Sequence, residues 1–365
     1  MKLLLFADLH LDTPFQWAPG AVARTRRQGL RDTLSRITQL AAEVGADALL
    51  CGGDLYEHER FSPDTAAFVR SVFELVHPLP VYLAPGNHDW YAPESLYCQV
   101  DWSPNVHVFT TDRLQPVTLA DGLTLWGAAH RAPANTDGFV EHFAVDRGGV
   151  HLALFHGSER HGLMQEGKGK IAHAPFDAEE LERAGLHHAF LGHYHRPRDA
   201  ARHTYPGNPE PLGFGEEGER GVVIATVAAD GSVTRTRRHV GTTTLHDDGV
   251  DITGCRSVHD IRDRVTRLLD GRSGVARLTF SGDLEPDVDL HLPAVLDAAP
   301  WMDALVLRLG TIRAAYDIDA LAAQPTVRGQ FVRDVNAADL PDDVRRRVLI
   351  TGLRALDGRD DLEAP

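Results

Sequence analysis

Five short apolar runs constrain the possible folds of this chain more than any other feature of its sequence. Each run is followed at once by a turn rich in Asp, His or Asn. An apolar run of four to eight residues between turn signals is typical of a buried strand. In open α/β sheets ligands collect beyond the carboxyl ends of the strands, so the five ends are expected to share one crevice. The runs are 3–7, 46–51, 81–84, 150–155 and 189–191. The polar side chains that follow them are Asp8, His10, Asp54, Asn87, His88, Asp89, His156, His193 and His195.

The length of 365 residues predicts two domains, which we place at 1–243 and 244–365, with a linker in the Thr-, Asp- and Gly-rich stretch 240–251. Helical spacing of apolar residues or end signals predict helices at 22–44, 63–75 and 177–184 in the first domain. Alternation predicts antiparallel strands within 105–129, and a last strand covers 221–229. In the second domain the pattern predicts helices at 258–269 and 342–356 and strands at 275–280 and 304–309.

Composition sets limits on partners and location. The net charge of −15 argues against general affinity for nucleic acid, so any DNA contact must be local. No stretch of eighteen apolar residues and no signal segment is evident, so we expect a cytoplasmic protein that does not enter a membrane. The three cysteines, Cys51, Cys98 and Cys255, have no paired spacing and are predicted to be buried thiols.

The residues at the strand ends are suited to hold two metal ions. Two divalent cations about 3.5–4 Å apart can activate water and neutralise the oxygens of a phosphoryl group in transfer. Such a pair needs a carboxylate that bridges both ions, and Asp54 is the natural bridge. Mixed oxygen and imidazole ligands favour Mn, with Fe, Zn or Co as alternatives, over Ca. Histidines away from the strand ends, such as His58, His130 and His188, are interpreted as bystanders.

In this order, Asp8-x-His10, Gly53-Asp54, Gly86-Asn87-His88-Asp89, His156 and Gly192-His193-x-His195 resemble the motifs of the calcineurin-like metallophosphoesterase superfamily, over roughly the first 200 residues. Within it, segments 7–15, 53–56 and 205–210 look like bacterial DNA repair exonucleases of the YhaO and SbcD type. The resemblance implies an α/β fold, an αββα sandwich in which two sheets lie between helical layers, followed by a small α+β capping domain.

The resemblance also implies roles for single residues. Asp8, His10 and His195 would hold one ion, Asn87, His156 and His193 the other, and Asp54 would join them. His88 would lie beside the scissile phosphate and stabilise charge or protonate the leaving oxygen. Asp89 would either orient the His88 imidazole, as supporting carboxylates do, or simply form the turn. Glu57 stands where some members of the family have His, and its role stays open.

Three further residues are candidates for substrate contact. Arg24 and Arg27 belong to a cluster with Arg26 and Arg31 at the start of the first predicted helix. Such a cluster is more often a solvated face than a phosphate-binding site, and we favour the solvated face. Tyr56 belongs to the segment that resembles the repair exonucleases.

The C-terminal region resembles the family chiefly at 326–333. The resemblance implies a capping domain that positions DNA, then a helical segment that docks on an SMC-like ATPase of the Rad and SbcC kind. The stripe Val344, Val348, Leu349, Leu353 and Leu356 is either that partner surface or part of the domain's own core. A homodimer is left open.

The leading hypothesis is therefore a metal-dependent phosphodiesterase that hydrolyses DNA, an exonuclease or endonuclease of double-strand break repair, with water as the nucleophile. One alternative is a small-molecule phosphoesterase acting on a cyclic nucleotide or a nucleotide pyrophosphate, which would suit the acidic charge better. Another is a non-catalytic scaffold for an SMC-like ATPase. Metal analysis separates the scaffold from both enzymes, because a scaffold has no reason to retain two ions.

Overall fold

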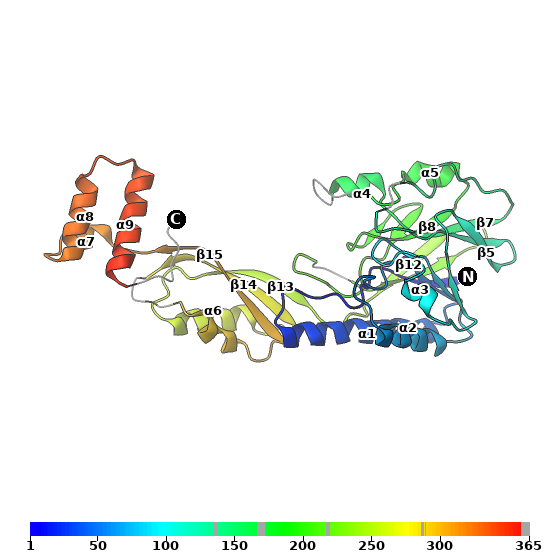
Figure 1. Cartoon of the computed structure of the whole chain (residues 1–365), viewed down its shortest axis with the longest axis horizontal. Helices are drawn as coiled ribbons and strands as arrows, with labels where there is room; N and C mark the ends of the chain where they lie inside the picture. Colours follow the sequence, from blue (N-terminus) through cyan, green and yellow to red (C-terminus); the bar gives the residue numbers. More distant parts are fainter. Residues whose placement is uncertain (135–136, 166–171, 217–219, 286–287, 289, 359–365) are drawn as a thin grey trace. The chain divides into compact units, whose positions relative to one another are not determined.

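A computed structural model of the chain describes residues 1–134, 137–165, 172–216, 220–285, 288 and 290–358. The chain divides into two compact units, residues 1–243 and 244–365, and each is described by itself. Figure 1 shows the elements of both units along the sequence.

Two six-stranded sheets form the centre of the first unit. The first sheet has the order β12-β11-β1-β2-β3-β4, and β1 to β4 are parallel. Its strands are β1 (Lys2–Phe6), β2 (Ala48–Cys51), β3 (Val81–Leu83), β4 (Val106–Val108), β11 (Val222–Val227) and β12 (Val233–Arg238). The second sheet has the order β5-β6-β7-β8-β10-β9. Its strands are β5 (Gln115–Ala120), β6 (Leu123–Gly127), β7 (Val150–His156), β8 (His188–Gly192), β9 (Arg198–Asp199) and β10 (His203–Tyr205).

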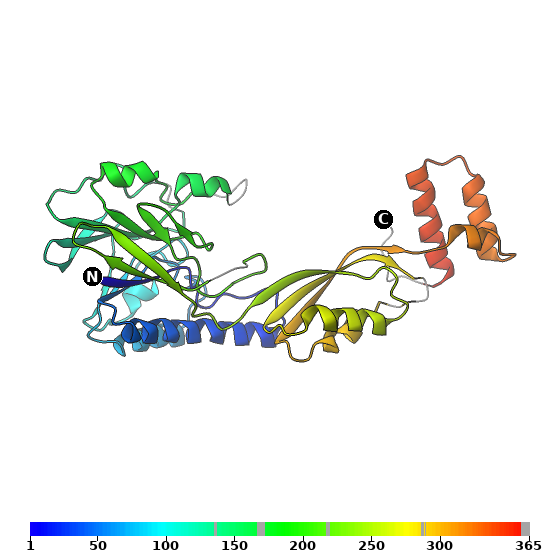
Figure 2. The same ribbon diagram turned by 180° about the vertical axis from the view of Figure 1, so that it is seen from behind.

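Helices cover the outer faces of the two sheets, as Figures 1 and 2 show for α1 and α2 on one side and α4 and α5 on the other. Leu4 and Phe6 of β1 belong to one buried cluster with residues of α1 and α2, whereas Leu3 and Leu5 belong to a second cluster with Leu152 of the other sheet. Strands that are buried on both faces place four layers in contact, so the predicted αββα sandwich is confirmed. The helices are α1 (Gly20–Glu43), α2 (Pro63–Glu74), α3 (Leu96–Gln99), α4 (Arg160–Gln165) and α5 (Ala178–Arg183).

Local signals explain where the helices begin and end. The Ser62 side chain accepts a hydrogen bond from the Thr65 backbone N–H at 3.2 Å, and Pro63 is the first helical residue of α2. Gly45 follows α1 with φ +62°, a left-handed conformation that glycine adopts without strain. The prediction of antiparallel strands over all of 105–129 is partly wrong: β5 and β6 are antiparallel, but β4 pairs with β3 in parallel.

The second unit contains a three-stranded parallel sheet and a group of helices. Its strands are β13 (Leu245–Asp251), β14 (Val275–Leu284) and β15 (Ala304–Ala314), and its helices are α6 (Val258–Leu269), the 3-10 helix η1 (Leu292–Ala298), α7 (Ile318–Ala322), α8 (Val327–Ala337) and α9 (Asp342–Leu356). The predicted linker 240–251 is wrong for most of its length, because β13 pairs with β14 through all seven of its residues. The two predicted strands are longer than expected.

The apolar stripe of α9 divides between core and surface. Leu349 and Leu353 are buried in one cluster with Leu321 of α7 and Val332 of α8. Val348 is 38% exposed and Leu356 is 46% exposed. The core interpretation therefore holds for Leu349 and Leu353, whereas Val344 is partly buried and Val348 and Leu356 are exposed in this unit.

Two further predictions concern the burial of the cysteines and the absence of a membrane-spanning segment. Cys51 and Cys255 are buried, but Cys98 is exposed, so the prediction of three buried thiols is wrong for Cys98. Among the described residues, no helix has the length and hydropathy that crossing a membrane requires.

His188, the first residue of β8, makes stability depend on pH. It is buried, its Nε2 lies 2.9 Å from Thr204 Oγ1, and burial together with the nearby Arg235 charge lowers its pKa to about 3. In the unfolded chain a histidine has a pKa near 6.5. Below that pH, His188 is protonated in the unfolded chain but stays neutral in the folded chain, so the free energy of unfolding falls. Between pH 7 and pH 5, we expect the free energy of unfolding to fall by about 2 kcal/mol more in the wild type than in His188→Gln. Urea unfolding of both proteins at the two pH values checks this, and equal losses would contradict it.

Candidate metal centre

The backbone turns sharply just after β1 and β2, and these turns aim two carboxylates at the same place. Asp8 and Asp54 both have left-handed backbones, with φ of +56° and +51°. Gly53, with φ +97°, is required before Asp54, because a Cβ there would lie 2.7 Å from His156 Nδ1 and 2.8 Å from the Ala84 carbonyl oxygen. Left-handed non-glycine residues are strained and persist where the surrounding structure holds them, often at functional sites.

Asp8, His10 and His195 form the first group of candidate ligands. One ligand atom from each lies within 4.8 Å of the others, and the Nε2 atoms of His10 and His195 are 3.2 Å apart. Asp8 is fully buried, its Oδ1 accepts the His193 backbone N–H at 2.9 Å, and its Oδ2 has no hydrogen-bond partner. Burial raises the pKa of Asp8 to about 8. A buried oxygen without a partner, beside two imidazole nitrogens that face each other, fits a cation site.

Asn87, His156 and His193 form the second group. His156 Nε2 lies 3.0 Å from Asn87 Oδ1 and 3.2 Å from His193 Nδ1. Burial lowers the pKa of His193 to about 3 and holds the pKa of His156 well below its usual range. His156 Nδ1 lies 3.0 Å from the Gly52 carbonyl oxygen and donates a hydrogen bond to it, so the unprotonated Nε2 can bind a metal.

Asp54 lies between the two groups. Its Oδ2 is 3.6 Å from His10 Nε2 and 3.3 Å from His156 Nε2, while its Oδ1 accepts the His88 backbone N–H at 2.9 Å. Burial alone would raise the pKa of Asp54, but the imidazoles of His156 and His10 lower it overall. One oxygen therefore faces both ligand groups, as a bridging carboxylate requires. The structure brings together all seven candidate ligands that the sequence singled out.

Glu57 contacts the Nδ1 atoms of two histidines of the site. Its Oε1 lies 2.8 Å from His10 Nδ1 and its Oε2 lies 3.0 Å from His88 Nδ1. The hydrogen bond to Glu57 raises the pKa of His88 to about 9, so His88 is a cation at neutral pH. The His88 side chain is 46% exposed, which leaves it accessible to a substrate. The sequence left the role of Glu57 open, and only the fold shows that one carboxylate orients both rings.

Asp89 does not orient His88. Its carboxylate accepts hydrogen bonds from the backbone N–H groups of Asp54, Leu55 and Gly86 at 3.1, 2.7 and 2.6 Å, and from the Tyr97 hydroxyl at 2.5 Å. Asp89 therefore ties the turn after β2 to the turn after β3. The turn-forming interpretation is correct and the imidazole-orienting one is wrong, since Glu57 occupies that place.

Glu216 supports the site from a segment that sequence analysis did not single out. Its Oε1 lies 2.6 Å from His195 Nδ1, and its Oε2 accepts hydrogen bonds from the Asn208 amide and the Leu212 backbone N–H, both at 2.7 Å. Glu216 lies twenty-one residues beyond His195, outside every segment that carried a motif. No local pattern marks such a long-range hydrogen bond.

The three candidate substrate residues differ in burial and in their contacts. Tyr56 is fully buried and its hydroxyl accepts the Leu96 backbone N–H at 3.0 Å, so its assignment to substrate contact is wrong: it is a core residue. Arg24 is exposed and Arg27 is partly buried, and neither has an ion pair or hydrogen bond among the described residues. Arg26 of the same cluster is buried and pairs with Glu210 at 2.6 Å, so it serves the fold.

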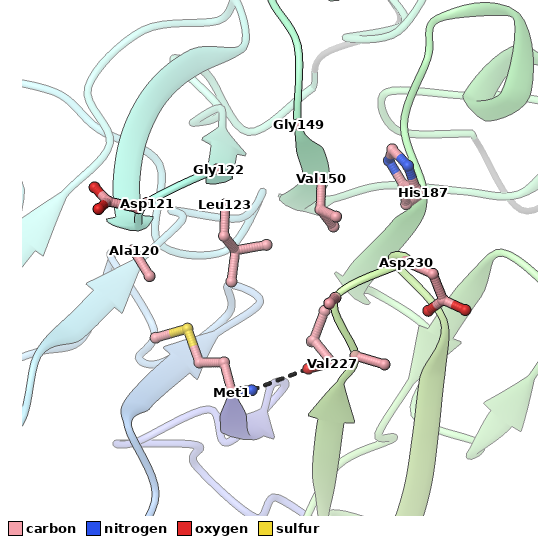
Figure 3. A pocket seen from close by; sticks show the side chains of 12 residues that line it. Met1, Ala120, Asp121, Gly122, Leu123, Gly149, Val150, His187, Val227 and Asp230 are labelled. Carbon is pink, nitrogen blue, oxygen red and sulfur yellow. Dashed lines mark hydrogen bonds between the residues drawn. The ribbon is translucent and has the colours of Figure 1, made fainter.

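A separate pocket of about 660 Å³ lies at the amino-terminal ends of the strands, away from these ligands. Figure 3 shows it between Met1, which precedes β1, Val150 at the start of β7 and the β11–β12 turn at Asp230. Its walls include none of the candidate ligands, which all lie at or after the carboxyl ends of the strands.

Glu57→Gln should weaken metal binding and activity together. The amide keeps the size of the side chain but loses the charge that orients His10 and His88, and such supporting contacts are worth about 10- to 100-fold in affinity or activity. A Mn titration of phosphodiesterase activity, with metal content measured in parallel, checks this. The control is Glu59→Gln, an exposed residue of the same loop. Wild-type metal affinity and activity in Glu57→Gln would contradict the role of Glu57.

Comparisons with known proteins agree with this geometry. The family model for calcineurin-like phosphoesterases matches residues 1–197. An uncharacterized metallophosphoesterase, YhaO of Bacillus subtilis (strain 168), is 26% identical over 234 residues, covering 60% of this chain and 56% of that protein. The resemblance seen in the sequence motifs is confirmed.

Two archaeal proteins are also similar. The DNA double-strand break repair protein Mre11 of Methanopyrus kandleri is 27% identical over 253 residues, covering 60% of this chain and 51% of that protein. Mre11 of Haloferax volcanii is 26% identical over 348 residues, covering 90% of this chain and 70% of that protein. The chain thus spans little more than half the length of the first two of these three relatives.

Proposed function

Because the chain belongs to the calcineurin-like phosphoesterase family, we propose that it is a two-metal phosphodiesterase that hydrolyses DNA. The observation that carries the proposal is the position of Asp54 Oδ2, 3.6 Å from His10 Nε2 in one ligand group and 3.3 Å from His156 Nε2 in the other. When bound, a pair of divalent cations would supply an activated water and neutralise charge on the phosphate oxygens. Asp8, His10 and His195 would hold one ion, and Asn87, His156 and His193 the other.

The remaining residues of the site have defined tasks in this proposal. His88, charged and half-exposed beside His10, stabilises negative charge on the phosphate or donates a proton to the leaving oxygen. Glu57 holds the His88 ring by Nδ1, which leaves Nε2 to face the substrate. Arg24 and Arg27 keep free guanidinium groups among the described residues, which suits contact with backbone phosphates.

DNA is favoured over a small phosphoester by the two relatives named as double-strand break repair proteins. The similarity to one of them extends over 348 residues and so includes much of the second unit. A single observation favours the small-molecule alternative: the net charge of −15 opposes long-range attraction of a polyanion.

A substrate panel with Mn tests the proposal. Single- and double-stranded DNA, a cyclic nucleotide and an aryl phosphate are incubated with the full chain and Mn, and metal content is measured on the same protein. We expect cleavage of DNA and about two ions per chain. Turnover of the cyclic nucleotide or aryl phosphate but never of DNA would replace the proposal with the small-molecule alternative. An inactive protein without bound ions would favour a scaffold. The same assay with Fe, Zn or Co in place of Mn identifies the preferred metal.

We extend the proposal to a partner, an SMC-like ATPase of the Rad and SbcC kind that docks on α9. Support comes from Val348 and Leu356, which expose apolar surface on the same helix that buries Leu349 and Leu353. Deletion of 340–365 would remove those two core residues as well, so Val348→Asp with Leu356→Asp is the sharper test. We expect this double variant to lose binding to the ATPase of its own organism while keeping its melting temperature. Undiminished binding would reject the surface.

A further inference from the structure

Three aromatic side chains form a patch that directly adjoins the histidine end of the metal centre. The rings of His58 and Trp90 are stacked, with centroids 4.0 Å apart and planes inclined by 32°. Phe61 is the second ring beside His58, with a centroid distance of 6.1 Å. All three side chains are partly exposed. We call His58, Phe61 and Trp90 the aromatic ledge.

The backbone joins the aromatic ledge to His88. His58 directly follows Glu57, the carboxylate that holds the His88 ring, and Trp90 comes two residues after His88 itself. The His58 backbone N–H donates to the His88 carbonyl oxygen at 2.9 Å. This bond holds the backbone of His58 next to the backbone of His88.

Trp90 differs from the other tryptophans in what it contacts. Trp17, Trp102, Trp126 and Trp301 each donate the indole N–H, to Leu212, Tyr97, His151 and Leu269 respectively. Within the described part of the chain, the Trp90 indole N–H has no acceptor, and Trp90 packs against none of the hydrophobic clusters. A large ring that contributes to no core and retains a free donor is available for an outside molecule.

We propose that the aromatic ledge is a stacking subsite for a nucleobase next to the scissile phosphate. This inference rests on the proposed function, since it requires a phosphodiester with a base attached. Every nucleobase has a flat π-face that stacks on an aromatic side chain, so the subsite is expected to accept all four bases. The stack with His58 holds the indole in place, which reduces the ordering that binding would otherwise require.

Two chromogenic esters with the same leaving group isolate the contribution of the base. One is thymidine 5′-(p-nitrophenyl phosphate), and the other is its abasic deoxyribose counterpart. We expect wild type to hydrolyse the thymidine ester with a kcat/KM about tenfold higher, in line with the strength of one base–aromatic stack. Trp90→Ala should lose this preference while its kcat/KM for the abasic ester stays within about twofold of wild type. Trp90→Phe should restore most of the preference, because phenylalanine also offers a flat face.

The outcomes separate the aromatic ledge from the proposed function. Equal losses on both esters would make Trp90 structural, and an unchanged preference would show that no base stacks there; either result overturns the inference. If neither ester is turned over, the DNA substrates of the panel above decide on the proposed function, and calorimetric binding of thymidine 5′-monophosphate and deoxyribose 5-phosphate decides on the aromatic ledge. Tighter binding of the nucleotide that disappears in Trp90→Ala supports it, and equal binding rejects it.

Discussion

Replacing Asp54 by Asn is expected to lower kcat/KM for a phosphodiester by about a thousandfold, equivalent to about 4 kcal/mol of transition-state stabilisation. The amide has nearly the same shape and can still accept the His88 backbone N–H. It is neutral, however, and its NH₂ group would face His10 and His156, where Asp54 Oδ2 lies now. An uncharged side chain with a donor at that point cannot join two cations.

Steady-state kinetics with Mn, together with metal content per chain, measures this effect. The variant should retain fewer than two ions and unfold at or above the wild-type temperature, because a buried charge has been removed. Asp64→Asn serves as control, since its side chain is 76% exposed on α2. Near wild-type turnover in Asp54→Asn would rule out a bridging role.

Replacing Glu210 by Ala should cost about 3–5 kcal/mol of unfolding free energy. Glu210 is fully buried and accepts hydrogen bonds from Arg26 Nη1 at 2.6 Å, Thr33 Oγ1 at 3.2 Å and the Thr242 backbone N–H at 2.6 Å. Without it the Arg26 guanidinium would remain buried, and among the described residues its one remaining acceptor would be the Pro211 carbonyl oxygen, at 2.6 Å. A buried cation that loses its counter-charge is strongly destabilising.

Urea unfolding of Glu210→Ala and of the double variant Arg26→Met with Glu210→Leu checks this explanation. The double variant removes both charges and keeps apolar volume, so it should recover most of the lost stability. A loss below about 1 kcal/mol in Glu210→Ala would contradict the prediction. The effect bears on the site, because Glu210 anchors the segment that carries Asn208, whose amide holds Glu216 behind His195.

The elements α6 and β13 show which secondary structure the local sequence pattern predicts correctly and which it does not. The helix α6 has apolar residues at Ile261, Val265 and Leu269, four apart, and its predicted range is correct. The strand β13 contains three Asp and one Gly in seven residues, which is typical of a loop. It is a strand because the neighbouring β14 offers a full row of backbone partners, and pairing outweighs the weak propensity of its own residues.

The sequence by itself indicated the seven candidate ligands, because each apolar run stops at a polar turn and the strand ends meet in an α/β fold. The sandwich fold was implied by the resemblance of these motifs to the calcineurin-like phosphoesterases. Only the tertiary structure decided that Glu57 holds His10 and His88, that Glu216 holds His195, and that Tyr56 lies in the core. The physical reason is that a hydrogen bond between distant side chains, or the enclosure of a ring, depends on which elements pack together. Nothing in the neighbouring residues records that packing.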